Sequence, residues 1–219
     1  MKFYFYLALN LSIFIPGIVA IMRYRFVQKS YYPFIYCLWL GCINESISLY
    51  KVFNNSHTLI NNNVYVLLES LLLLLFFYRL GLTISKNILF TLSTLFIIAW
   101  VSENFIFRSI TVNSTYFRIF YSFILVLLSV NTINKKIFTR NKGLLSDATF
   151  MICCGFIIYF TYKIIVQAFA IYGFSKQSAF LLNIYIIMYY INFTVNIIYT
   201  FAVIWMPRKI KYSLQSLLQ

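Results

Sequence analysis

Acidic side chains are rare in this chain of 219 residues, and three of the four fall inside long apolar runs. Glu45, Glu69 and Glu103 each lie within a run long enough to cross a bilayer, whereas Asp147 lies at the edge of one. A carboxylate at membrane depth costs a few kcal/mol, so it normally faces the interior of a helix bundle and serves a function. These three glutamates are therefore the first candidates for ligand binding or ion coupling.

Lys163 is a fourth charge within an apolar run, and its depth resembles that of the glutamates. With a rise of about 1.5 Å per residue, Glu45 and Glu69 lie about 6 Å from the middle of their runs toward one face of the bilayer. Glu103 lies about 9 Å and Lys163 about 3 Å toward that same face. This agreement predicts that the four charges share one interior cavity in the outer half of the bilayer, with Lys163 paired with Glu45 or Glu69.

Several uncharged polar residues lie one helical turn from an intramembrane charge or from each other, so that they share a helix face. The candidates among them are Trp100, Gln167, Asn192 and Asn196. Polar contacts between helices can also simply hold a bundle together, and packing is the favoured interpretation of the two asparagines. A binding site or a proton-linked switch is the favoured interpretation of the charges, because helix packing does not require ionisable groups.

The composition indicates that membrane helices position these residues. Hydrophobic residues make up 62% of the chain, charged residues make up 10%, and the mean hydropathy is +0.84. A soluble domain contains about 45–50% apolar and about 25% charged residues. At roughly 20 residues for each span, several spans would occupy most of the chain and leave little for a soluble domain.

The apolar runs predict an all-α fold, an integral membrane bundle of seven transmembrane helices that forms a single domain over residues 1–219. The predicted segments comprise residues 3–22, 31–50, 64–82, 87–107, 116–133, 148–174 and 178–206. The first run resembles a signal peptide in length, but Arg23 and Arg25 follow it directly, which favours a retained span.

Positive charge predicts the orientation of this bundle. The 18 lysine and arginine residues fall mainly in the short segments on one side of the seven-span arrangement. Because positive charge accumulates in cytoplasmic loops, we expect an external N-terminus and a cytoplasmic C-terminus. Residues with AT-rich codons are frequent, and we predict a multi-pass protein of a bacterial cytoplasmic membrane, the cell inner membrane. The net charge of +14 lies in short loops between apolar runs, which argues against nucleic acid as a partner.

The predicted cytoplasmic loop over residues 134–147 is the most basic of the short segments. It carries Lys135, Lys136, Arg140 and Lys142. The simplest interpretation is a topology anchor. The functional interpretation is a basic surface that contacts anionic lipid or a cytoplasmic partner protein.

Enzyme chemistry finds little support in the sequence. The single histidine, His57, lies in a predicted outer loop, and no HExxH, P-loop or GxSxG motif is present. Cysteine spacing suggests no zinc site, so no metal or cofactor is predicted. The leading hypothesis is a non-enzymatic sensing or binding module, or the membrane subunit of a larger system, with a polar cavity in its outer half. The alternative is a small transporter or ion pathway that uses the glutamates, and the third hypothesis is a lipid-acting intramembrane enzyme. The ligand and the oligomeric state stay open.

Overall fold

The computed structural model of the chain describes residues 8–54, 56–139, 146–171 and 179–209. Over these residues the fold is an all-α bundle, as predicted. A helical stretch from Ala8 leads through a 3-10 turn, Leu11–Ile13, into the first long helix, and a π-helical turn, Ser102–Phe107, extends α5. The long helices are α2 (Phe14–Arg23), α3 (Tyr32–Phe53), α4 (Leu59–Leu80), α5 (Lys86–Val101), α6 (Thr115–Thr139), α7 (Ala148–Ile171) and α8 (Ala179–Trp205).

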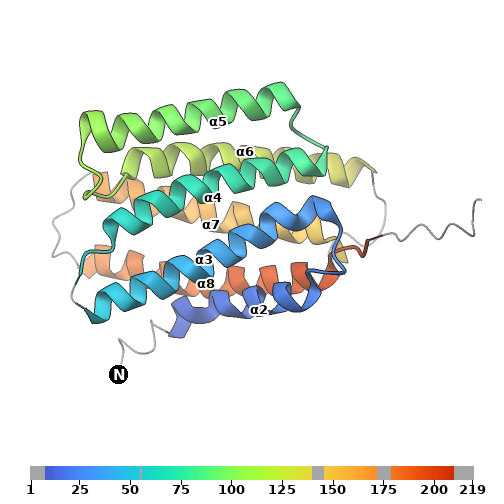
Figure 1. Ribbon diagram of the computed structural model, residues 1–219, viewed down its shortest axis with the longest axis horizontal. Coiled ribbons are helices and arrows are strands. Elements are labelled where there is room, and N and C mark those ends of the chain that lie inside the picture. Colours follow the sequence, from blue (N-terminus) through green and yellow to red (C-terminus); the bar gives the residue numbers. More distant parts are fainter. Residues whose placement is uncertain (1–7, 55, 140–145, 172–178, 210–219) are drawn as a thin grey trace, which may run out of the picture.

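Consecutive helices run in opposite directions along the long axis of the molecule (Figure 1). Each helix packs against its neighbours in the chain, and α8 returns to pack against α2, which closes the bundle into a ring. Helix α4 also packs against α6, so α5 lies outside that pair. We call the end of the bundle at which α3 ends the amino end (left in Figure 1), and the end at which α8 ends the carboxy end.

Five of the helices are long and apolar enough to cross a membrane, which indicates a membrane protein. They cover Leu59–Leu80, Lys86–Phe107, Thr115–Phe138, Ala148–Ile171 and Ile186–Trp205. Helix α3 has 22 residues, but polar side chains such as Asn44 and Glu45 lower its hydropathy. The first predicted segment, residues 3–22, begins outside the described residues, and its described part, Ala8–Arg23, is a shorter apolar helix.

Two helices extend beyond the predicted segments because tertiary contacts satisfy their polar residues. Helix α4 begins at Leu59 and includes a polar run that the sequence places in a loop. In that run, the Asn61 amide donates to Asn44 Oδ1 at 2.7 Å. Helix α6 continues to Thr139, and Lys135 near its end donates to the carbonyl of Leu82 at 2.6 Å. Polar residues therefore stay helical wherever a neighbouring helix or turn offers a partner.

Local chemistry explains where several helices begin and end. Pro33 occupies the first turn of α3. Backbone N–H groups in the first turn have no partner within the helix, so the N–H that proline lacks costs no hydrogen bond there. Helix α4 ends at Gly81, whose φ of 68° is accessible to glycine at little cost. Ser85 Oγ accepts from the backbone of Ile88 at 3.4 Å to begin α5, and Asp147 Oδ1 accepts from Phe150 at 3.1 Å to begin α7.

Aromatic side chains fill the interior toward the carboxy end of the ring. Phe34, Phe76, Phe156 and Tyr199 come from α3, α4, α7 and α8, and we call them the aromatic cluster. The Phe34 ring lies 5.7 Å from Phe76, 5.9 Å from Phe156 and 5.2 Å from Tyr199. Three of the four residues are at most 2% exposed. Tightly packed aromatic side chains therefore close this part of the helix bundle.

The polypeptide also joins α2 to α8 at the carboxy end. Val27 and Arg208 form an isolated antiparallel bridge, in which Gln28 donates to Pro207 at 3.0 Å and Lys209 donates to Phe26 at 2.8 Å. The Arg23 guanidinium donates to the carbonyls of Val203 and Met206 at the end of α8. These bonds satisfy terminal carbonyls of α8 and connect the end of α8 to the end of α2.

We expect Gly155→Ala to destabilise the bundle. A methyl group at Gly155 would overlap the ring of Tyr199, and that ring cannot move freely because it packs edge-on against Phe34. Overpacking of this kind costs about 1–3 kcal/mol. The free energy of unfolding in detergent measures the effect. Gly41→Ala is the matched control, because its added methyl meets the flexible end of Ile13. Equal stability of the two variants would contradict this account of the α7–α8 contact.

Candidate functional site

A buried ion pair lies in the middle of the ring. Lys163 on α7 places its Nζ 3.2 Å from Glu69 Oε2 on α4, and both residues are 5% exposed. The sequence left the partner of Lys163 open between two glutamates, and the structure pairs it with Glu69. The two helices are not neighbours in the ring order, so this contact connects opposite walls of the bundle.

Tyrosines complete the coordination of this ion pair. Tyr121 donates to Glu69 Oε2 at 2.7 Å, and Tyr65 donates to Glu69 Oε1 at 2.9 Å. The ammonium of Lys163 donates to the Tyr121 hydroxyl and lies 5.0 Å from the ring centre of Tyr159. Both carboxylate oxygens and the ammonium are thus hydrogen-bonded, which is the condition under which a buried pair offsets its desolvation penalty. We call Glu69, Lys163, Tyr65 and Tyr121 the ion-pair network.

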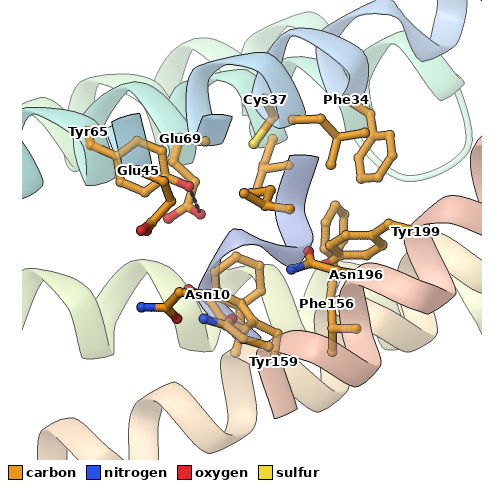
Figure 2. Close-up of a pocket in the computed structure, with 17 residues that line it drawn as sticks. Asn10, Phe34, Cys37, Glu45, Tyr65, Glu69, Phe156, Tyr159, Asn196 and Tyr199 are labelled. Atoms are coloured by element: carbon orange, nitrogen blue, oxygen red, sulfur yellow. Dashed lines mark hydrogen bonds between the residues drawn. The ribbon is translucent and has the colours of Figure 1, made fainter. Parts of the chain in front are cut away.

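Glu45 lies beside this network but takes no part in it. Within the described residues, its carboxylate makes neither a hydrogen bond nor an ion pair. Figure 2 shows the carboxylate pointing into open space, with Tyr65 and Glu69 on one side and Asn10 and Tyr159 on the other. Glu45 is half-buried between neighbouring helices, and a carboxylate in such a place without a protein partner among the described residues is available to a ligand.

The space in front of Glu45 is a cavity of about 100 Å³, which we call the aromatic cavity. Its walls come from the stretch before α2 and from α3, α4, α7 and α8. Its lining combines four polar side chains with rings of the aromatic cluster, and the polar residues are Asn10, Glu45, Asn192 and Asn196. Figure 2 shows Asn196 beside Tyr199, and Glu45 at the other end of the cavity. Asn196 also donates to Ser12 Oγ at 2.8 Å, so it serves the packing role that its spacing suggested as well as lining the cavity.

A second cavity of about 220 Å³ adjoins the first, and Glu45, Tyr65 and Tyr159 line both. We call it the charged cavity, because Glu45, Arg118 and Lys163 all contribute to its walls. Asn62 and Arg118 near the starts of their helices, and Gln167 near the end of α7, place it toward the amino end of the bundle. Gln167 accepts from the Asn113 amide at 3.1 Å, so its oxygen is already used.

Glu103 does not join the other three charges, and the prediction of one cavity for all four is wrong on this point. It lies on the π-helical turn after α5, where both its carboxylate oxygens accept backbone N–H groups at the start of α6. The Tyr116 N–H donates to Oε1 at 3.0 Å, and the Phe117 N–H donates to Oε2. A carboxylate is favourable there because the first N–H groups of a helix lack partners and carry partial positive charge. Glu103 lines a separate groove on the outside of α5 and α6.

Trp100 also has a structural role, and it lies outside the two cavities. Its indole N–H donates to the Asn63 carbonyl at 2.8 Å. The Asn63 side chain in turn donates to the carbonyls of Ile110 and Val112 and accepts from Ser114 and Arg118. This fully buried asparagine therefore ties the connection between α5 and α6 to α4. This role could not be predicted from the sequence, because one asparagine in an asparagine-rich run carries no distinguishing signal.

The predicted basic surface is partly described. Lys135 donates to Leu82, and Lys136 forms an ion pair with Asp147 at 3.0 Å, so both contribute to the carboxy end of the bundle. Arg140 and Lys142 lie outside the described residues. Asp147 both caps α7 and neutralises a lysine of α6, which is a structural role for the fourth acidic residue.

Sequence reasoning missed two other residues of the site. Arg118 is not among the predicted site residues, but it lines the charged cavity. Tyr65 precedes Glu69 by one helical turn, and this spacing could have identified it as a partner. No group of three histidine, cysteine or acidic side chains that could hold a metal ion occurs in the described part of the chain. Comparison with models of protein families, with curated proteins and with solved structures finds no match for this chain.

We expect the Glu69–Lys163 pair to show strong coupling in a double-mutant cycle. Lys163→Met alone leaves a buried carboxylate without its cation and should lower the free energy of unfolding by about 3–5 kcal/mol. The double variant with Glu69→Gln should be more stable than Lys163→Met, because both desolvation penalties are removed. Chemical denaturation in detergent measures all variants. Glu45→Gln is the control and should change stability by less than about 0.5 kcal/mol, because no protein contact is lost. Additive effects of the pair would contradict the coupling.

Proposed function

We propose that the protein is a non-enzymatic binding module of a membrane, which admits a small ligand into the charged and aromatic cavities. The observation that carries this proposal is the Glu45 carboxylate, which faces both cavities without a partner among the described residues. Ionisable groups at membrane depth are retained at sites of function, and the other three such charges already have protein partners. A ligand would therefore supply the missing partner of the Glu45 carboxylate.

The arrangement of the two ends supports binding rather than passage through the bundle. The aromatic cluster lies between the aromatic cavity and the carboxy end, and its rings are 5.2–6.0 Å apart. Polar groups that could guide a solute gather instead toward the amino end, around Arg118 and Asn62. A transporter requires a polar route to both sides, so it ranks second, supported by the same unpartnered glutamate.

An enzyme that acts on lipid would need an available carboxylate in a cleft that lipid can enter. Glu103 lines a groove of about 610 Å³ on the outside of α5 and α6, which is the cleft that best meets the second condition. Both of its oxygens, however, accept backbone N–H groups of α6. The carboxylate that lines this groove is therefore already bound, and the enzyme hypothesis ranks third.

We also propose that the helices cross the membrane seven times with the amino end outside. The basic residues of the carboxy end support this orientation, because positive charge accumulates on the cytoplasmic side. Those within the described residues are Arg23, Arg25, Lys29, Arg79, Lys86, Lys135, Lys136, Arg208 and Lys209. A bacterial cytoplasmic membrane fits this proposal. The described residues of the carboxy end form short turns between helices, and a sensor would act through a cytoplasmic partner or anionic lipid at the basic residues there.

The proposed topology predicts opposite labelling of two exposed positions. In a background without the four native cysteines, Ser56→Cys lies at the amino end and Asn87→Cys at the carboxy end. A membrane-impermeant maleimide added to intact cells should label Ser56→Cys, and Asn87→Cys should label only after the membrane is permeabilised. Gel-shift of a heavy maleimide measures both. Labelling of both positions in intact cells would reject the proposed arrangement.

The binding module predicts one-sided access to the cavity. Asn192→Cys, in the same background, places a thiol in the lining of the aromatic cavity. A small cationic methanethiosulfonate should modify it from the side of the amino end and not from the side of the carboxy end. Ser70→Cys is the matched control, because Ser70 is fully buried and lines neither cavity. Modification of Asn192→Cys from both sides would favour the transporter instead.

A further inference from the structure

We infer that the ligand is a zwitterionic α-amino acid with an apolar side chain, whose ammonium group binds Glu45 and whose carboxylate binds Arg118. This inference rests on the proposed binding function and names the class of ligand for the same site. It comes from the charges that remain in the charged cavity after the contacts within the protein are counted.

The charges of the cavity are not all neutralised by each other. Lys163 is paired with Glu69 at 3.2 Å, so neither is available as a charge for a ligand. Among the residues that the structure describes, Glu45 has no partner, and Arg118 binds only neutral oxygens, the Asn62 carbonyl and Asn63 Oδ1, each at 3.3 Å. Within the described residues, Glu45 and Arg118 line the same cavity without forming an ion pair with each other.

Arg118 carries a further sign of an absent partner. Its Nε is buried and has no hydrogen-bond partner among the described residues. A buried donor without an acceptor is unfavourable, and a guanidinium satisfies a carboxylate with parallel N–H groups. A ligand carboxylate in the charged cavity would supply the missing acceptor. The bonds from Arg118 to Asn62 and Asn63 meanwhile hold the guanidinium in place.

The opposite charge at Glu45 determines the other end of the ligand. A carboxylate that faces a cavity without a partner selects a cation with several N–H donors, and the Asn44 side chain lies on the same wall. A molecule that carries only one of the two charges would leave either Glu45 or Arg118 uncompensated inside the bundle. That difference favours a ligand with both charges over a simple amine or a simple acid.

The aromatic cavity determines what joins these charges. It measures about 100 Å³ and continues from the charged cavity past Glu45, Tyr65 and Tyr159 toward the rings of the aromatic cluster. With the charged groups at Glu45 and Arg118, an apolar side chain would enter this space and bury its surface against Phe34 and Tyr199. The two cavities together thus match a polar backbone and a single apolar side chain.

The test is isothermal titration calorimetry of the purified full-length chain in detergent. The ligands are L-leucine, its amine-only analogue 3-methylbutylamine, and its acid-only analogue 4-methylpentanoate. L-Leucine should bind at least about tenfold more tightly than either analogue. L-Alanine, L-valine, L-methionine and L-phenylalanine extend the search across side-chain size. Absence of measurable binding by all five amino acids would overturn the inference, as would equal binding of L-leucine and one analogue.

Two variants assign the charges. Glu45→Gln should weaken L-leucine binding about tenfold while leaving 4-methylpentanoate unchanged, because only the ammonium site is altered. Arg118→Gln should weaken L-leucine and leave 3-methylbutylamine unchanged. Arg108→Gln is the control, because Arg108 is exposed and lies over the Tyr116 ring outside both cavities. Unchanged L-leucine binding by Glu45→Gln would overturn the inference even where Arg118→Gln does not fold.

A lipid headgroup can carry the same two charges, and one further titration distinguishes a lipid from a free amino acid. Short-chain phosphatidylethanolamine is titrated in place of the amino acid, and binding of this lipid without binding of L-leucine would overturn the inference. Failure here is distinguishable from failure of the binding module itself. One-sided modification of Asn192→Cys together with no response to amino acids would retain the module and reject only its assigned ligand.

Discussion

The buried ion pair between Glu69 and Lys163 is the interaction on which the interior of this bundle depends. Each charge alone would be costly at membrane depth, and each is stabilised by the other together with the hydroxyls of Tyr65 and Tyr121. The pair links α4 to α7 across the ring of helices. Glu45, one helix away, has no such compensation within the described residues, and the contrast between the two glutamates defines the site.

The interior is divided along the bundle axis by the kind of side chain that fills it. Toward the carboxy end, rings from four helices pack at centroid distances typical of edge-to-face contacts and leave little free volume. Toward the amino end, amides, charged groups and tyrosine hydroxyls surround two adjoining cavities. The division is consistent with a module that receives a ligand at one end and keeps the other end closed. The bridge between Val27 and Arg208 reinforces that closed end.

Charges at similar depth have different roles because their neighbours differ. Glu103 lies where α6 begins, and unpaired backbone N–H groups occupy both its oxygens. Asp147 does the same for α7 while also binding Lys136. Glu69 is held by a lysine and two tyrosines. Of the four acidic residues, only Glu45 is left to face a cavity without a protein partner in the described part of the chain, and the functional proposals rest on that difference.

The sequence by itself determined that the chain forms apolar helices, because the length and hydropathy of each run depend only on residues close together in the chain. It also identified Glu45, Glu69 and Lys163, since an ionisable group in an apolar run is conspicuous without any knowledge of its neighbours. The depth of a residue along its helix could be counted from the sequence. Which side of each helix points into the bundle could not be determined in this way. The counted depth therefore placed Glu103 with the other charges, whereas the π-helical turn and the start of α6 give it a separate role. The partner of Lys163, the inward position of Arg118 and the buried role of Asn63 depend on contacts between residues 47–94 positions apart, and only the packing of the helices decides these.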